Sequence, residues 1–342
     1  MDDLRDIGDL ELYIAQSMVI NVFLSHGYFK SRNCLREVQA TVETWKPFMI
    51  THEIDTSKGG GSLNEMKVEL GDTRLCDVIF SKERRITTWY RIADFQLVSI
   101  KQIAEFTLLQ TPKYKDREKL DIIVPGELLR QPLGFAEPVV VYSSPNNPGA
   151  RALATELEKA YHHGIKATAT LPRNLHKTRE LGDVRPTHFL LYLNVDTFNG
   201  EAGIQLANEL RIARAAGLPV VMAHENDPER GGCEFSRFFR TTPEDLINGG
   251  LYKALALEFY PGPNHRPVSM AQVAMALATL PPAGGSFSAL SRSTVRSVSR
   301  LQKSRLACTL LCKQLPRLRF LRARQAQNAV LVVAPPQDEM AV

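Results

Sequence analysis

Two copies of one acidic motif carry the residue types best suited to chemistry in this sequence. Each copy follows a hydrophobic run and leads into a basic residue and two glycines. The motif residues are His52, Glu53 and Asp55 in the first copy and His224, Glu225 and Asp227 in the second. Imidazole and carboxylate groups could ligate a metal, but the motif follows a strand and lacks the i, i+4 helical spacing of a zinc protease. We therefore expect no metal and favour a structural role, in which the acids fix the turn; contact with a ligand at a sheet edge is the second interpretation.

The motif belongs to a longer internal repeat. Three blocks recur along the chain with offsets of 169, 172 and 170 residues. They pair residues 22–25 with 191–194, 37–60 with 209–232, and 98–104 with 268–274. Collinear blocks with a nearly constant offset indicate two units of one architecture.

The second copy predicts alternating strands and helices. Short hydrophobic runs predict strands over 138–142, 165–170, 188–193, 218–223 and, more weakly, 255–259. Apolar residues at helical spacing predict helices around 150–161, 206–217 and 269–280. This alternation predicts an α/β fold with a flavodoxin-like, doubly wound parallel sheet in the order 2-1-3-4-5.

The first copy begins in the middle of this pattern, because the offset places residue 1 opposite position 170 of the second copy. Strands are expected over 18–24 and 47–51, and helices over 10–15, 35–45 and 92–109. The strand over 18–24 should therefore have an unpaired edge. We expect a partial domain over 1–110, a linker over 111–137, a complete domain over 138–282 and a disordered tail over 283–342.

The first copy has a distinctive series of residues around its first strand. An acidic segment from Asp2 to Gly8 precedes a helix, and the strand ending in Ser25 leads to Tyr28, Cys34 and Glu37. This series resembles the second half of a TIR domain, the Toll/interleukin-1 receptor type, over residues 1–60. The second copy shares the architecture but has Asn194 in the place of the serine, so its assignment depends on the internal repeat.

The resemblance implies a function for one glutamate in each copy. Some TIR domains hydrolyse NAD with a glutamate on the helix after the third strand, a position that falls on Glu37 and Glu209. Such a carboxylate could stabilise the positive charge that develops as nicotinamide leaves. The alternative is a solvent-facing glutamate in an early helical turn, favoured by the helix dipole. A site also needs the loop after the first strand, which the second copy supplies with Ser143, Ser144 and Asn146.

The composition and the cysteine pattern indicate an ordinary soluble protein without disulfides. The chain has 342 residues, of which 44% are apolar and 23% charged, as in ordinary soluble proteins. Met1 is followed by acidic residues instead of a signal sequence, and no long apolar run is present, so we expect a cytoplasmic protein. The five cysteines form no C-x-x-C pair, which argues against disulfides and a zinc knuckle.

The C-terminal tail is strongly basic. From Pro281 onward the net charge is +8, whereas the whole chain carries +5, so residues 1–280 are mildly acidic. A basic amphipathic segment could contact an anionic membrane or a partner, although we favour a disordered tail. No interleaved aromatic residues support specific nucleic-acid binding.

These features give three functional hypotheses. The first is a TIR-like signalling module that self-associates with other TIR-like domains into a homo-oligomer. The second is an NAD hydrolase that uses Glu209 or Glu37, with NAD as substrate and no cofactor. The third is a small-ligand sensor built on a flavodoxin-like sheet.

Overall fold

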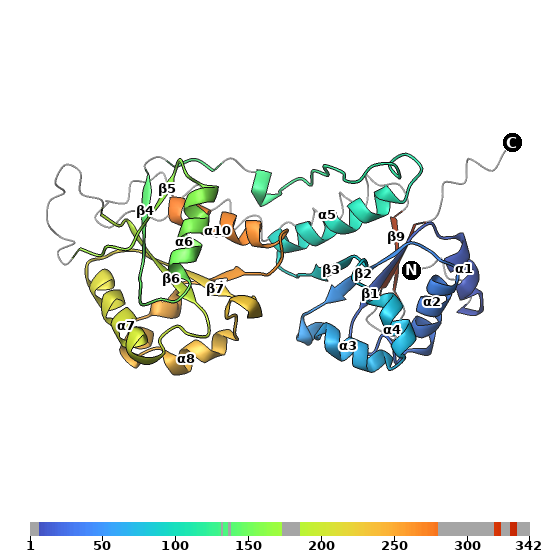
Figure 1. The fold of residues 1–342 in the computed structure, drawn as a ribbon, viewed down its shortest axis with the longest axis horizontal. Coiled ribbons are helices and arrows are strands. Elements are labelled where there is room, and N and C mark those ends of the chain that lie inside the picture. The colour runs from blue at the N-terminus through green and yellow to red at the C-terminus, as the bar shows by residue number, and fades with distance from the viewer. Residues whose placement is uncertain are drawn as a thin grey trace. The chain divides into compact units, whose positions relative to one another are not determined.

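The computed structural model describes residues 7–130, 133–135, 138–172, 185–279, 318–322 and 329–333. The chain divides into two compact units, residues 1–125 with 299–342 and residues 126–298 (Figure 1). Each unit is an α/β structure built around parallel strands. The predicted fold class, flavodoxin-like and doubly wound, is confirmed.

The sheet of the second unit has the strand order β5-β4-β6-β7-β8, and all its strands are parallel. Numbered along the chain, this is the predicted order 2-1-3-4-5. The strands are β4 (Val139–Ser143), β5 (Ile165–Thr168), β6 (His188–Leu193), β7 (Val220–Glu225) and β8 (Leu257–Phe259). The helices are α6 (Ala150–Ala160), α7 (Gly200–Ala215), α8 (Phe238–Thr241), α9 (Glu244–Asn248) and α10 (Arg266–Thr279), with 3₁₀ turns η3 (Leu128–Arg130), η4 (Pro228–Arg230), η5 (Phe235–Arg237) and η6 (Leu251–Lys253).

Two hydrophobic cores cover the two faces of this sheet. Helices α6 and α10 pack on one face through residues such as Leu153 and Val273. Helix α7 packs on the other through Leu206, and Figure 1 shows α8 on the same side as α7. Since side chains alternate along a strand, β6 sends Tyr192 to the α6 face and Leu191 to the α7 face.

The first unit has three parallel strands in the order β3-β2-β1, and β1 is the counterpart of β6. The strands are β1 (Ile20–Leu24), β2 (Phe48–Glu53) and β3 (Ile86–Trp89). The helices are α1 (Leu10–Gln16), α2 (Arg32–Glu43), α3 (Leu63–Leu70), α4 (Thr73–Ile79) and α5 (Ala93–Leu109), with 3₁₀ turns η1 (Ile7–Asp9) and η2 (Thr56–Lys58). Helices α1 to α4 share one hydrophobic core with β1 and β2, and α5 contacts β2 and β3.

Two strands of the tail correct the predictions for the edge of β1. Strand β10 (Ala329–Val333) pairs antiparallel with β1, and β9 (Leu318–Arg322) pairs with β10. The expected unpaired edge is therefore wrong, and so is the expectation of disorder for these two stretches. The offset of the internal repeat could not reveal the pairing of β10 with β1, because these strands lie about three hundred residues apart in the sequence. The rest of the tail lies outside the described residues.

Candidate functional site

The acids of the second motif close a tight turn after β7. Glu225, the last residue of β7, is fully buried, and its Oε1 accepts a hydrogen bond from the backbone N–H of Asp227 (2.9 Å). The Oδ1 of Asp227 accepts in turn from the backbone N–H of Glu229 in η4 (3.0 Å). Both acids thus satisfy backbone donors that a turn would otherwise leave unpaired.

His224 and two glycines hold the same turn. The Nε2 of His224 lies 2.7 Å from the carbonyl oxygen of Cys233. Gly231 has a φ of +79°, in the left-handed region that favours glycine. A Cβ on Gly232 would lie 2.5 Å from the carbonyl carbon of Asn226, so no other residue fits there.

The first unit repeats these contacts at the same offset of 172 residues. The Oε1 of Glu53 accepts from the N–H of Asp55 (2.9 Å), and the Oδ1 of Asp55 accepts from the N–H of Ser57 (2.9 Å). The Nε2 of His52 lies 2.7 Å from the carbonyl oxygen of Gly61. This agreement supports the structural interpretation of the motif. Among the residues that the structure describes, no group of three or more His, Cys, Asp and Glu could hold a metal ion.

The two histidines differ in their second ring nitrogen. The Nδ1 of His224 lies 2.9 Å from the Oε2 of Glu258, its register partner on β8. Burial opposes the charged imidazolium, but the hydrogen bond and charge of Glu258 favour it. Together with the carbonyl of Cys233 and the charge of Glu225, they raise the pKa of His224. The register partner of His52 is Thr88, and burial lowers the pKa of His52.

His224 is therefore expected to titrate with a pKa above its ordinary value of 6.5, and Glu258→Gln should lower that pKa. Because the raised pKa belongs to the folded state, the contribution of the His224 charge to stability is present below pH 6.5 and is lost as the pH rises through the folded pKa. The pKa of Glu258 is lowered, so the contribution of the pair also falls when acid protonates this carboxylate. NMR titration of the histidine ring signals, assigned with His224→Gln, measures the shift. An unchanged pKa in Glu258→Gln would show that the carboxylate does not act on the ring.

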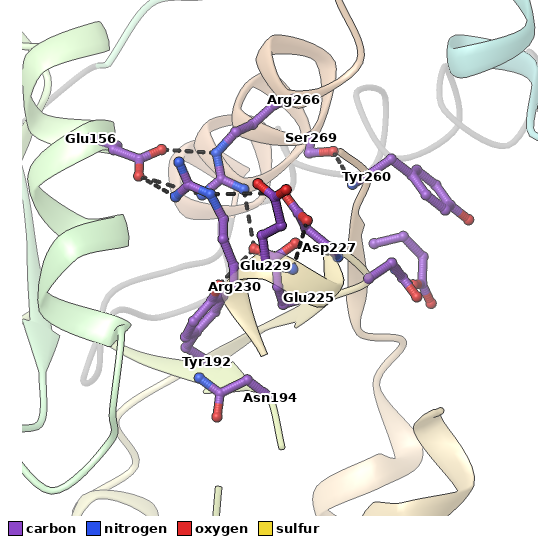
Figure 2. Close-up of polar contacts among 12 residues, drawn as sticks. Glu156, Tyr192, Asn194, Glu225, Asp227, Glu229, Arg230, Tyr260, Arg266 and Ser269 are labelled. Carbon is purple, nitrogen blue, oxygen red and sulfur yellow. Dashed lines mark hydrogen bonds and ion pairs between the residues drawn. The ribbon is translucent and has the colours of Figure 1, made fainter. Parts of the chain in front are cut away.

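The remaining oxygen of Glu225 is the centre of a charged cluster on the α6 face (Figure 2). Its Oε2 accepts from the hydroxyl of Tyr192 (2.6 Å) and from the Nη1 of Arg266 (3.0 Å). The Nε of Arg266 also donates to the Oε2 of Glu156 on α6 (3.0 Å), and Arg230 donates to the Oε1 of Glu156 (2.9 Å). Burying a carboxylate costs free energy, which a cation and further hydrogen-bond donors of this kind offset.

The first unit pairs its buried glutamate with a different arginine. Both Nε (3.1 Å) and Nη2 of Arg91 donate to the Oε2 of Glu53. Phe23 stands at the repeat position of Tyr192, so no hydroxyl competes for this oxygen. The described part of the first unit has no counterpart of α6, and therefore none of Glu156.

The internal repeat does not predict these arginines. The matched serines Ser99 and Ser269 align Arg266 with Gln96, and Arg91 with Pro261. Each arginine instead lies after the last parallel strand of its unit, at or just before the start of the following helix. Only a general signal in the sequence could have identified these arginines. A buried glutamate at the end of a strand requires a cation, and each copy has an arginine between its last parallel strand and the following helix.

Glu209 contacts the loop after β4, as expected from the sequence. It is half-buried on α7, where its Oε2 accepts from the hydroxyl of Tyr142 (3.0 Å) and its Oε1 from the amide of Asn146 (2.7 Å). The Oγ of Ser144 accepts the backbone N–H of Asn146 (3.0 Å) and so orients the loop. Ser143 is buried and bonds to β5 instead of Glu209.

Glu37 has a different environment on α2. It is half-buried, and the hydroxyl of Tyr28 donates to its Oε2 (3.4 Å). Burial raises the pKa of Glu37 to about 7, against the opposing effect of this hydrogen bond. Both glutamates lie beyond the first turn of their helices, where the dipole acts most strongly, and both are half-buried with hydrogen-bond partners. These contacts argue against the interpretation as solvent-facing glutamates stabilised by the helix dipole.

The two acidic sites of the second unit lie on opposite faces of the sheet. Glu209 bonds to Tyr142, which belongs to the core under α7. Glu225 bonds to Tyr192, which belongs to the core under α6 and α10. The structure therefore does not bring the repeated motif together with Glu209.

Comparisons with protein-family models, with curated proteins and with solved structures find no match to this chain. No helix in the described ranges combines the length and the apolar character needed to cross a membrane.

Proposed function

We propose that the chain is a signalling module that works by self-association, with α7 of the second unit as the contact surface. The observation that supports this proposal is the outer face of α7. Ile204 is 57% exposed and Ile212 is 49% exposed, and their spacing of eight residues places them on one side of the helix. Two large apolar side chains exposed on one side of a helix supply apolar area that a partner can cover.

The shape of this face favours a second copy of the chain as the partner. When two copies of α7 pack antiparallel across a two-fold axis, Ile204 of each copy lies opposite Ile212 of the other. Asn208, which is exposed between the two isoleucines, lies near the axis and brings no charge to the contact. The face is therefore complementary to itself in apolar character.

The first unit exposes an aromatic side chain at the equivalent connection. Trp45 follows α2, which joins the counterparts of the third and fourth strands. It is 91% exposed and has a φ of +53°, which is uncommon for a bulky residue. Exposed tryptophans often anchor interfaces, so this residue offers a second contact point.

The molar mass of the full chain, measured by light scattering, is expected to rise with concentration toward that of a dimer or larger assembly. The double variant Ile204→Lys, Ile212→Lys should weaken association at least about tenfold, because it replaces apolar contact with like charges. The control is Ile123→Lys, which introduces the same residue at another exposed isoleucine (64%) outside α7. Association that is the same in all three proteins would contradict the proposed surface.

A second candidate function, NAD hydrolysis, is supported by the contacts of Glu209. Tyr142 and Asn146 each donate to one carboxylate oxygen, which fixes its direction. A carboxylate held in this way can stabilise the positive charge on a ribose ring as nicotinamide leaves. Glu37, with a pKa of about 7, could exchange protons near neutral pH.

If this second function is present, concentrated full-length protein should release nicotinamide from NAD. Glu209→Gln should then reduce the rate about 100-fold, as is typical when one electrostatic stabiliser of a transition state is removed. Glu201→Gln changes an exposed glutamate on the same helix and should leave the rate unchanged. Absence of release in the wild type would exclude this function, and release that survives Glu209→Gln combined with Glu37→Gln would exclude these residues.

A further inference from the structure

We propose that the first unit binds an oxyanion, a carboxylate or phosphate group, between Arg91 and Lys58. This is the place that the side chain of Glu156 fills in the second unit. The inference does not depend on the proposed self-association or on NAD hydrolysis, because it concerns other residues.

The second unit shows what such an anion would contact. The carboxylate of Glu156 bridges two guanidinium groups, with Oε2 on the Nε of Arg266 (3.0 Å) and Oε1 on the Nη1 of Arg230 (2.9 Å). Figure 2 shows both arginines pointing toward this carboxylate from different elements. Paired guanidinium donors of this kind suit carboxylate and phosphate groups.

The first unit has two cations around the position that corresponds to the Glu156 carboxylate. Lys58 stands at the repeat position of Arg230, and Arg91 takes the role of Arg266. The Nε of Arg91 lies 3.8 Å from the Oδ2 of Asp55. The hydroxyl of Ser57 lowers the pKa of Asp55, and the charges of Arg91 and Lys58 lower it further, so both cations lie near one carboxylate.

The balance of charge leaves room for one more anion. The cluster of the second unit holds three carboxylates and two cations, namely Glu156, Glu225 and Asp227 with Arg230 and Arg266. The cluster of the first unit holds two carboxylates and two cations, namely Glu53 and Asp55 with Arg91 and Lys58. Arg91 has a 43% exposed side chain, so solvent reaches it, and among the described residues no ion pair engages Lys58.

The sheet beside these cations also carries a buried polar pair where the second unit has apolar residues. In the second unit Leu190 and Ala223 belong to the apolar core beneath α6. The first unit has Asn21 and Thr51 at these repeat positions, and the hydroxyl of Thr51 donates to the Oδ1 of Asn21 (2.7 Å). The face that α6 covers in one unit thus carries a polar pair in the other. Both residues of the pair are buried, so they make the sheet beneath the site more polar and do not themselves form an open surface.

Tryptophan fluorescence can test this inference in the full chain. Trp45→Phe leaves Trp89, the register partner of Glu53, as the only tryptophan. Titration with sodium acetate and with sodium phosphate, each against sodium chloride at equal ionic strength, should give a saturable change with at least one of the two oxyanions. The two titrations show whether the site prefers a carboxylate or a phosphate group.

Two lysine variants in the Trp45→Phe background localise the effect. Lys58→Gln should weaken binding at least about tenfold, because it removes one of the two cations. Lys82→Gln removes the same charge from the segment before β3, at the opposite end of the parallel strands, and should leave binding unchanged. Responses identical to those with chloride, or equal weakening by the two lysine variants, would overturn the proposal.

Discussion

Replacing Arg266 with alanine is expected to lower the free energy of unfolding of the second unit by about 3–5 kcal/mol, because it leaves a buried charge without its partner. Glu225 is fully buried, and the side chain of Arg266 is only 14% exposed. The hydroxyl of Tyr192 and the backbone N–H of Asp227 would remain as donors, but neither carries a positive charge. Urea denaturation followed by circular dichroism measures the loss, and hydrogen exchange of the β7 amides assigns it to this unit.

A second arginine provides the matched control. Arg211 makes two hydrogen bonds to Asp245, both 2.8 Å, but their side chains are 40% and 58% exposed. Arg211→Ala should therefore destabilise the unit much less than Arg266→Ala. Adding Glu225→Gln to Arg266→Ala should recover part of the loss, since it removes the uncompensated charge. Equal losses for the two arginine variants would show that Glu225 does not depend on Arg266.

Gly232→Ala is expected to destabilise the second unit by about 3 kcal/mol, at the upper end of the usual cost of overpacking. The new Cβ would lie 2.5 Å from the carbonyl carbon of Asn226 and 2.7 Å from the backbone nitrogen of Asp227. Backbone atoms cannot rotate away, so the turn that holds Glu225 must open. Gly60→Ala should act similarly in the first unit, where the Cβ would lie 2.5 Å from the carbonyl carbon of Ile54.

Gly134→Ala separates this steric effect from the general effect of changing a glycine. A Cβ at Gly134 meets nothing within 4 Å, so we expect a change within about 0.5 kcal/mol. Denaturant unfolding of the three variants tests the prediction. A mild effect for Gly232→Ala would mean that the turn tolerates a side chain and that its glycines are not required by packing.

The sequence predicted the elements with strong local signals. Strand β6 begins and ends at the predicted residues, 188 and 193, because its hydrophobic run is bounded by polar and turn residues. The order of the second sheet followed from the alternation of strands and helices. The repeat also predicted the positions of both acidic turns, since identical residue types at one offset adopt the same hydrogen bonds.

Other features depend on tertiary contacts or on weak local signals. Strand β3 has only four residues and lies where the repeat is weakest, so it was missed. Helix α3 was also missed, although Ser62 and Glu65 form a capping box and Gly71 ends the helix, a signal that the sequence did carry. Arg91 and Arg266 reach their glutamates from positions that do not align, so only the folded chain shows their shared role.

Disulfide cross-linking tests self-association through α7 most directly. Asn208 is exposed on α7 between Ile204 and Ile212, and would lie near the two-fold axis of a dimer of these helices. Oxidation of Asn208→Cys should give a covalent dimer in high yield, whereas Lys159→Cys, at an exposed position on α6, should give no more than the wild-type chain with its own cysteines. Equal cross-linking at both positions, or none at Asn208→Cys, would contradict the proposed association surface.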